Sequence, residues 1–194
     1  MEQLSKDKPA LLIIDLVKDT FNPDHPLPIT PFAAKIIPTI NELCEMFRKH
    51  GWPVIFSTDA FQETDFIFKG RMKPHSLAGT PGAEIADGLD YRPEIDTWLP
   101  KPRFSAFFGT GLEKMLHEQG VTMCVVTGIS TNFCVLTTAM DALCHDFKVV
   151  LLEDCTAAAN ENIHKSVLEI YRRNPLNPLF RVASSRDLKD LLQG

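Results

Sequence analysis

Short apolar runs alternate with longer amphipathic or mixed segments along most of the chain. Runs with the length and composition of buried parallel strands lie at 10–15, 53–59, 97–101, 122–127, 148–152 and 179–182. Helices are expected at 31–50, 112–119, 131–145 and 185–193, with a further one after a loop that opens at 153–157. This alternation predicts an α/β fold of three layers, with a mostly parallel central sheet and helices on both faces.

The segment 60–93 interrupts the alternation and is richer in Gly, Pro and charged residues than its flanks. In a compact domain, a segment of this length either covers a site or contains short elements of its own. The chain has 194 residues, of which 44% are hydrophobic, which is enough for a domain with a sizeable core. We therefore expect residues 1–194 to form a single domain.

The net charge is −5, and the Lys and Arg residues are scattered rather than gathered into a stripe, so no nucleic-acid partner is expected. No apolar run approaches the ~20 residues that cross a bilayer, and no N-terminal signal pattern is present. The five cysteines have no metal-ligand spacing and are odd in number, as is typical of reduced thiols. We expect a cytoplasmic protein without a membrane partner.

Ionisable residues follow several of the expected strands. Asp15, Asp59 and Lys101 each end one, and the turn from Gly128 to Cys134 follows another. In open parallel sheets, ligands bind outside the carboxyl ends of the strands. The fold is therefore expected to bring these residues to one rim.

Cys134 stands where a helix is expected to begin, directly after a strand. A thiol in the first turn of a helix is close to unpaired backbone N–H groups and the positive end of the helix dipole, which lower its pKa. The same N–H groups can bind an oxyanion. The alternative is that Cys134 is a small buried hydrophobe, since free cysteine is among the most buried residue types.

A cysteine nucleophile needs a group that takes its proton, and this is usually a histidine. The histidines outside 60–93 lie in a Pro-rich loop, near helix ends or on a late helix, and none is well placed. Asp15 is instead placed to accept the proton, with Lys101 beside the thiolate. Taken singly, Asp15 could cap a helix and Lys101 could be a solvated strand end.

Four motifs resemble one known family. They are Asp15 after its Ile-Ile run, the stretch 101–110 (KPRFSAFFGT), the stretch 128–142 (GISTNFCVLTTAMDA) and the stretch 153–158 (EDCTAA). In this order they resemble the isochorismatase-like cysteine hydrolase superfamily, which includes nicotinamidases, carbamoylsarcosine-type amidases and isochorismatases. The resemblance extends over about 9–184. It implies the Rossmann-like fold of these hydrolases and a homo-oligomer, either a dimer or a tetramer.

The resemblance also implies a catalytic triad. Cys134 is then the nucleophile, Asp15 the general acid and base, and Lys101 the electrostatic support. The peptide bond between Ile129 and Ser130 is expected to be cis, and the backbone N–H groups of Ser130 and Cys134 to form an oxyanion hole. The implied reaction is hydrolysis of a small-molecule amide through a thioester.

Two other functions stay open at this point. Isochorismatases cleave a vinyl ether by protonation and as a group lack the nucleophilic cysteine, so in that case Asp15 would donate a proton and Cys134 would be incidental. A ligand-binding protein without catalysis would keep only the fold. Dinucleotide binding is not indicated, because no Gly-x-Gly-x-x-Gly follows the first strand.

Nicotinamidases carry a metal beside the triad, and this chain matches that site only in part. Asp59 and His75 correspond to two ligands, but Phe61 stands in place of an intervening histidine. Stable zinc sites supply three or four protein ligands, so Asp65 or Glu63 would have to contribute, or His75 only forms a hydrogen bond in its loop. The triad implies no cofactor, and a divalent Zn or Fe site is incomplete.

The substrate is less well defined than the reaction. Four aromatic residues are candidates for an apolar pocket wall or for plain core, namely Phe21, Phe61, Phe104 and Phe107. Nicotinamide, another small amide, a carbamoyl compound and a ureido compound all remain compatible with the sequence.

Overall fold

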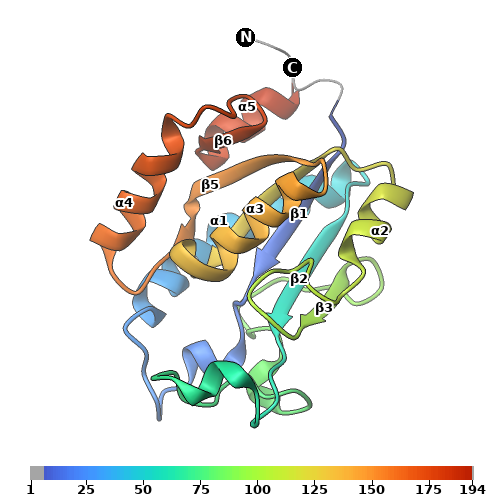
Figure 1. Cartoon of the computed structure of the whole chain (residues 1–194). Helices are drawn as coiled ribbons and strands as arrows, with labels where there is room; N and C mark the ends of the chain where they lie inside the picture. Colours follow the sequence, from blue (N-terminus) through green and yellow to red (C-terminus); the bar gives the residue numbers. More distant parts are fainter. Residues whose placement is uncertain (1–6, 194) are drawn as a thin grey trace.

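The structure is a computed structural model that describes residues 7–193. Six strands form one parallel sheet in the order β3-β2-β1-β4-β5-β6 (Figure 1). The strands are β1 (Pro9–Ile14), β2 (Val54–Asp59), β3 (Thr97–Lys101), β4 (Met123–Ile129), β5 (Lys148–Ala157) and β6 (Phe180–Ala183). This confirms the expected α/β class and the parallel sheet.

Helices cover both faces of the sheet (Figure 1). They are α1 (Thr30–Lys49), α2 (Leu112–Glu118), α3 (Leu136–Cys144), α4 (Glu161–Arg172) and α5 (Ser185–Gln193). Side chains of a strand alternate between the two faces. Leu11 and Ile13 of β1 accordingly lie in the core with α1 and α5, whereas Leu12 and Ile14 lie in the core with α2, α3 and α4.

The strand β5 is longer than the sequence pattern indicates. The segment 153–157 was expected to open a loop, but it continues the strand to Ala157. Pairing of β4 with β5 shifts register between Val126 and Gly128, and then resumes as Gly128 opposite Thr156. The apolar run ends at Leu152 because Glu153 and Asp154 sit at this irregularity with partly exposed side chains.

The segment 60–93 contains two short 3-10 turns, η2 (Phe66–Lys69) and η3 (Pro81–Ala83), so it has short elements of its own. The expected helix at 131–145 is divided into a π-helical turn, η4 (Thr131–Val135), and α3.

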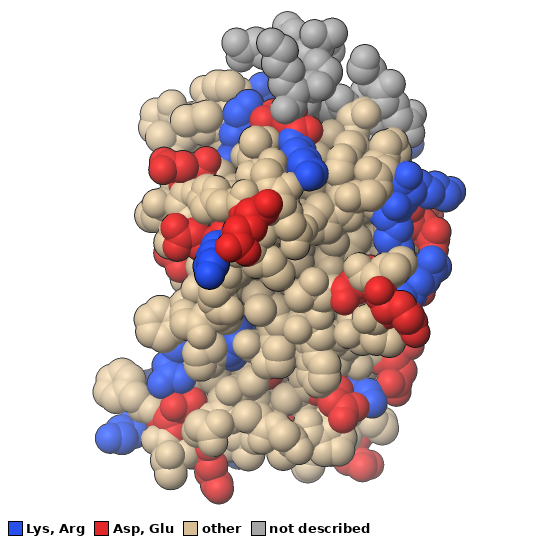
Figure 2. Space-filling view, turned by 90° about the vertical axis from the view of Figure 1, so that its right-hand side faces the viewer, with Lys and Arg blue, Asp and Glu red and all other residues tan. Residues whose placement is uncertain are grey.

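On the side that carries α2 and β3, acidic and basic side chains are interspersed around a broad uncharged middle (Figure 2). Among the described residues, no helix has the length and apolarity needed to span a bilayer.

Candidate active site

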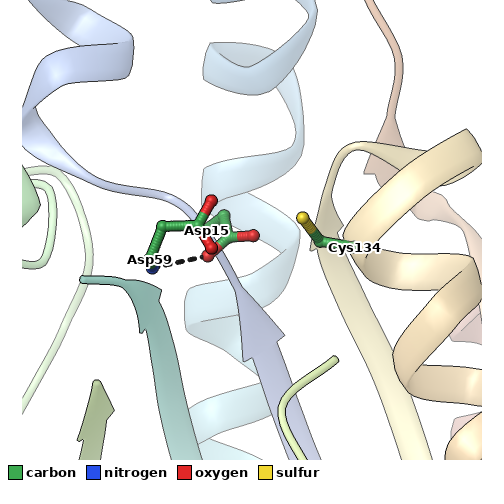
Figure 3. A group of neighbouring side chains, drawn as sticks. All are labelled: Asp15, Asp59 and Cys134. Carbon is green, nitrogen blue, oxygen red and sulfur yellow. Dashed lines mark hydrogen bonds between the residues drawn. The ribbon is translucent and has the colours of Figure 1, made fainter. Parts of the chain in front are cut away.

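The carboxyl ends of four neighbouring strands bring the expected triad together. Asp15 follows β1, Asp59 ends β2, Lys101 ends β3, and Cys134 lies in η4 directly after β4. Asp59 pairs with Lys101 in the register of β2 and β3. One ligand atom from each of Asp15, Asp59 and Cys134 lies within 4.8 Å of the other two (Figure 3). The rim expected from the sequence is therefore a compact buried cluster.

Backbone contacts fix the orientation of Asp15. Its φ of 54° lies in the left-handed region, and its N–H donates to the carbonyl of Ser57 at 2.9 Å. Its Oδ1 accepts the backbone N–H of Asp59 at 2.8 Å, and its other carboxylate oxygen points toward the sulfur of Cys134 (Figure 3). The same carboxylate is thus anchored at one oxygen and directed at the thiol with the other.

Lys101 is completely buried, and its ammonium group lies between two carboxylates. Its Nζ is 2.9 Å from Oδ2 of Asp15, donates to Oδ1 of Asp59, and donates to the carbonyl of Arg103 at 3.1 Å. Burial alone would lower the pKa of Lys101, but the neighbouring acidic groups, Asp15 first and then Cys134 and Asp59, raise it above its usual value. The residue is therefore a fixed cation in a site that excludes most water.

Asp59 shares this single ammonium group with Asp15. Burial and the negative charge of Asp15 raise the pKa of Asp59 to about 8, although Lys101 acts in the opposite direction. Two carboxylates that share one cation favour retention of one proton. At neutral pH, Asp59 is therefore mostly protonated.

The pKa of Cys134 differs from the sequence-based expectation. Burial, followed by the negative charge of Asp15, raises the pKa of this thiol well above its ordinary value, and Lys101 only partly offsets the increase. The lowered pKa expected from a helix N-terminus is therefore wrong for the resting site. The thiol holds its proton until a neighbouring base removes it.

The turn that carries Cys134 is closely held. The N–H groups of Phe133 and Val135 both donate to the carbonyl of Ser130, at 2.9 and 3.3 Å. The Ser130 hydroxyl donates to Oδ1 of Asn132 at 2.7 Å, and the peptide bond between Ile129 and Ser130 is cis. Ser130 and Cys134 both line the same cavity.

This cavity has a volume of about 230 Å³ and opens beside the cluster. It is smaller than the ~300–1,000 Å³ typical of pockets for drug-sized ligands. Polar lining residues are Asp15, Thr20, Asp59, His75, Ser76, Ser130 and Cys134, and the apolar ones are Val17, Leu27, Ile29, Phe61, Met72, Phe104, Ile129 and Phe133. A small, mostly apolar molecule fits this space.

Two of the four candidate pocket aromatics line the cavity, and two lie elsewhere. Phe61 and Phe104 are part of the wall. Phe21 packs beside the core on the α1 side and lines a different surface cavity, because successive side chains of the 3-10 turn η1 (Lys18–Phe21) point in different directions and it is Thr20 that lines the cavity beside the cluster. Phe107 is buried against His145 and Phe147, with ring centroids 5.2 and 6.0 Å apart, and belongs to the core.

Much of the apolar wall was missed in the sequence. Leu27, Ile29 and Met72 come from loops that have no hydrophobic periodicity, and Phe133 lies next to the nucleophile within the turn. Loop residues of this kind carry no pattern that distinguishes a pocket wall from ordinary surface. Of these wall residues, only Phe133 could have been inferred from its position in the sequence, because it directly precedes Cys134 in the turn that follows the cis bond.

The residues present do not fit a divalent metal centre. Asp15, Asp59 and Cys134 are close enough to share an ion, but the ammonium group of Lys101 is paired with both carboxylates. The ring of Phe61 lies edge-on to His75 with centroids 5.5 Å apart, and it offers no ligand atom.

The two substitute ligands are also unsuitable. Asp65 is engaged by the guanidinium group of Arg103 at 3.0 Å, and Glu63 is exposed at the surface. The Nδ1 atom of His75 lies 2.9 Å from the carbonyl of Lys73, so this ring is hydrogen-bonded within its own loop.

Comparisons with known proteins identify the family of this chain. Residues 9–184 match the isochorismatase domain. A relative from Arabidopsis thaliana, named a probable inactive nicotinamidase, is 33% identical over 166 residues, which cover 80% of this chain and 83% of the relative. The chain therefore belongs to the isochorismatase family.

Two solved structures are similar over nearly their whole length. N-carbamoylsarcosine amidase from Thermoplasma acidophilum is 30% identical with a TM-score of 0.77, covering 92% of this chain and 96% of that one. Pyrazinamidase from Pyrococcus horikoshii, solved in complex with zinc, is 30% identical with a TM-score of 0.78, covering 91% and 99%. Because these relatives are named as amidases, the family supports a hydrolase that acts on amides.

Proposed function

We propose that this protein is a cysteine-dependent amidohydrolase in which Cys134 attacks the carbonyl carbon of a small amide. The observation that carries the proposal is the contact between Cys134 and Asp15. Oδ2 of Asp15 pairs with the ammonium group of Lys101 at 2.9 Å and accepts no other described hydrogen bond, and a hydrogen bond to Asp15 is among the causes that raise the pKa of the thiol. Asp15 is thus open to receive the thiol proton.

In the first half-reaction, the thiol proton passes to Asp15 as the sulfur forms a bond to the amide carbon. Lys101 stays charged and lowers the energy of the anionic sulfur. The oxygen of the tetrahedral intermediate is bound by the backbone N–H groups of Ser130 and Cys134. Asp15 then gives its proton to the amide nitrogen, the C–N bond breaks, and ammonia or an amine leaves.

In the second half-reaction, a water molecule replaces the amine beside Asp15. Asp15 accepts a proton from this water as its oxygen bonds to the thioester carbon. The C–S bond breaks, the proton returns to the sulfur, and the carboxylic acid is released. One carboxylate therefore serves as base and acid in turn, and the residues of the site supply both steps without a metal ion.

The cavity favours a substrate with an uncharged, compact acyl group. Among the described lining residues there is no Lys or Arg, and Lys101 is already paired with Asp15 and Asp59. A carboxylate on the substrate would lie among apolar side chains and close to two acidic ones, without a counter-charge. Burying an unpaired charge in this way costs several kcal/mol.

Substitution of Cys134 by Ser tests the mechanism. Ammonia release from a panel of small amides should fall at least about 1,000-fold, because the two-step route needs the thiol. The matched control is Cys144→Ser, which changes an exposed cysteine at the end of α3 and should leave turnover unchanged. An acyl group on Cys134, detected by mass spectrometry after acid quenching, would show the thioester.

The same experiment separates the two alternatives. Activity retained in Cys134→Ser but lost in Asp15→Asn would select hydrolysis of a vinyl ether by protonation, and pyruvate would then be the product to assay. Binding of small amides without any turnover by the wild type would instead select a non-catalytic member of the family.

A further inference from the structure

A side chain outside the pocket contacts the turn that carries the nucleophile. His164 of α4 lies with its Nδ1 2.9 Å from the hydroxyl oxygen of Thr131. Thr131 is completely buried, begins the π-helical turn η4, and precedes Cys134 by three residues. The contact joins an outer helix to the segment whose backbone sets the direction of the sulfur.

His164 also connects this turn to the sheet. A hydrogen bond to the backbone of Glu153 in β5 is among the influences on its imidazole, so the ring bridges β5 and η4. The start of α4 is fixed by Asn160, whose side chain accepts the N–H of Asn162 at 2.7 Å. The imidazole is therefore held from the helix, the sheet and the turn.

Charged groups surround the ring from three elements. Glu161 and Lys165 flank it on α4, the carboxylate of Glu153 faces it from β5, and Lys35 of α1 lies across a small cavity of about 210 Å³ that His164 also lines. Burial lowers the pKa of His164, against the opposite influence of Glu153 and Glu161. The ring is therefore mainly neutral at pH 7, so its Nδ1 can accept the proton of the Thr131 hydroxyl.

The turn needs such an anchor because its geometry is irregular. A π-helical turn is rare, occurs mostly as a single turn within an α-helix, and is frequent at functional sites. A displacement of about 1 Å between reacting groups can reduce a rate by ~100-fold. Here the sulfur of Cys134 must stay directed at Asp15 while the backbone of the same turn faces the oxyanion.

We propose that His164 is a positioning residue, which acts through the Thr131 hydroxyl to hold the Cys134 turn in register with Asp15. The inference rests on the proposed function of this site. It adds a residue that touches neither the cavity beside Cys134 nor the substrate, and it places that residue on an outer surface of the protein next to an open groove of about 990 Å³.

Two variants remove the contact and two retain it. His164→Ala and Thr131→Val should lower kcat between about 10- and 100-fold with KM changed by less than about twofold, because alignment rather than binding is lost. His164→Asn keeps a polar atom near the position of Nδ1, and Thr131→Ser keeps the hydroxyl, so both should restore most of kcat. The double variant His164→Ala with Thr131→Val should be no slower than the worse single variant.

A second measurement does not depend on knowing the substrate. The rate at which iodoacetamide alkylates Cys134, followed by peptide mass spectrometry, reports the pKa of the thiol. Removing the anchor moves the sulfur away from Asp15, whose charge raises that pKa, so the midpoint of the pH profile should fall by ~0.5 unit or more. Ser166→Ala is the matched control on the exposed face of α4 and should leave the profile unchanged.

Unchanged kcat and an unchanged alkylation midpoint in both His164→Ala and Thr131→Val would overturn the inference. So would failure of His164→Asn and Thr131→Ser to restore kcat, since a purely structural role would not depend on the retained polar atom. If His164→Ala does not fold, Thr131→Val decides by the same two readouts. Failure of the proposed function appears separately, as turnover that survives Cys134→Ser.

Discussion

Asp59 is bound to Asp15 twice, once through its backbone and once through a shared cation. Its N–H donates to Oδ1 of Asp15 at 2.8 Å, and the carboxylates of both residues pair with the ammonium group of Lys101. The position that the resemblance assigned to a metal ligand is therefore occupied by a carboxyl group that adjusts the charge of the triad. The charge of Asp59 should control both the pH dependence of activity and that of stability.

Turnover should fall as the pH rises through about 8. Asp59 loses its proton in this range, and the new negative charge acts on Cys134 to raise its pKa further, so the thiolate becomes harder to form. In Asp59→Asn this alkaline decline should shift or disappear, since the amide cannot ionise. The measurement is the pH profile of kcat/KM from pH 6 to 10 for both proteins, and identical alkaline limbs would contradict it.

The ionisation of Asp59 should also make the stability of the protein depend on pH. The folded-state pKa of about 8 lies above the unfolded value near 4, so the folded protein retains a proton that the unfolded chain has lost. The contribution of Asp59 to the free energy of unfolding is therefore complete below about pH 4 and is lost as the pH rises to about 8. Denaturant titrations should give wild type and Asp59→Asn similar stabilities at pH 5, whereas at pH 8.5 the wild type should be the less stable of the two, because only its side chain has to ionise in the folded state.

Asp15→Asn should change alkylation and turnover in opposite directions. Removing the negative charge of Asp15 lowers the pKa of Cys134, so the thiol should react faster with iodoacetamide at pH 7.5. Turnover should fall by ~100- to 10,000-fold, because the group that accepts and returns the proton is absent. Parallel decreases in both rates would show that Asp15 only maintains the structure of the site.

The sequence was sufficient to predict that Asp15, Lys101 and Cys134 lie together, because the topology of the sheet determines where strand ends meet. Asp15, Lys101 and Cys134 are far apart along the chain, but each follows a strand, and parallel strands present their carboxyl ends at one edge. The motif at 128–142 and the resemblance then distinguished them from other strand-end residues. Neither required knowledge of side-chain contacts.

What the sequence did not predict depends on packing. The raised pKa of Cys134 follows from burial and from the charge of Asp15, and neither can be derived from a position at a helix start. The extension of β5 through Glu153 and Asp154 depends on a register shift against β4, which interrupts the apolar pattern. The sequence does not distinguish Phe107 from Phe61, and only the structure shows that Phe107 belongs to the core whereas Phe61 lines the pocket.

Gly128→Ala should destabilise the protein by at least ~2 kcal/mol. Gly128 has a φ of 99°, and a Cβ there would overlap the backbone of Ile14 in the neighbouring strand. Gly70 is the matched control, because a Cβ at that position meets only open space and one carbonyl at 3.9 Å. Thermal and denaturant unfolding of the two variants should differ by this amount, and equal stabilities would disprove the steric argument.

Prolonged treatment with a chelator should leave turnover unchanged. Lys101 already supplies the positive charge beside Asp15 and Asp59, and the ring of Phe61 offers no ligand. The test compares activity before and after dialysis against EDTA, together with metal analysis by mass spectrometry. Activity that is lost on dialysis and recovered on addition of Zn²⁺ or Fe²⁺ would show that a metal centre forms despite this residue set.

Uncharged amides should be hydrolysed in preference to acidic ones. The two solved relatives are named for one substrate of each kind, since pyrazinamide is neutral and N-carbamoylsarcosine carries a carboxylate. With no Lys or Arg among the described lining residues, kcat/KM for a neutral amide should exceed that for a carboxylate-bearing amide of similar size by at least ~100-fold.

A substitution in the wall tests the cause of this preference. Met72→Lys places a cation at the cavity, where Met72 is half-buried and flanked by exposed residues. It should raise kcat/KM for the acidic amide and lower it for the neutral one, whereas Met72→Leu should change neither by more than about twofold. A wild-type preference for the acidic amide would mean that a charge outside the described lining binds the carboxylate, and Arg71 and Lys73 beside Met72 would be the first residues to substitute.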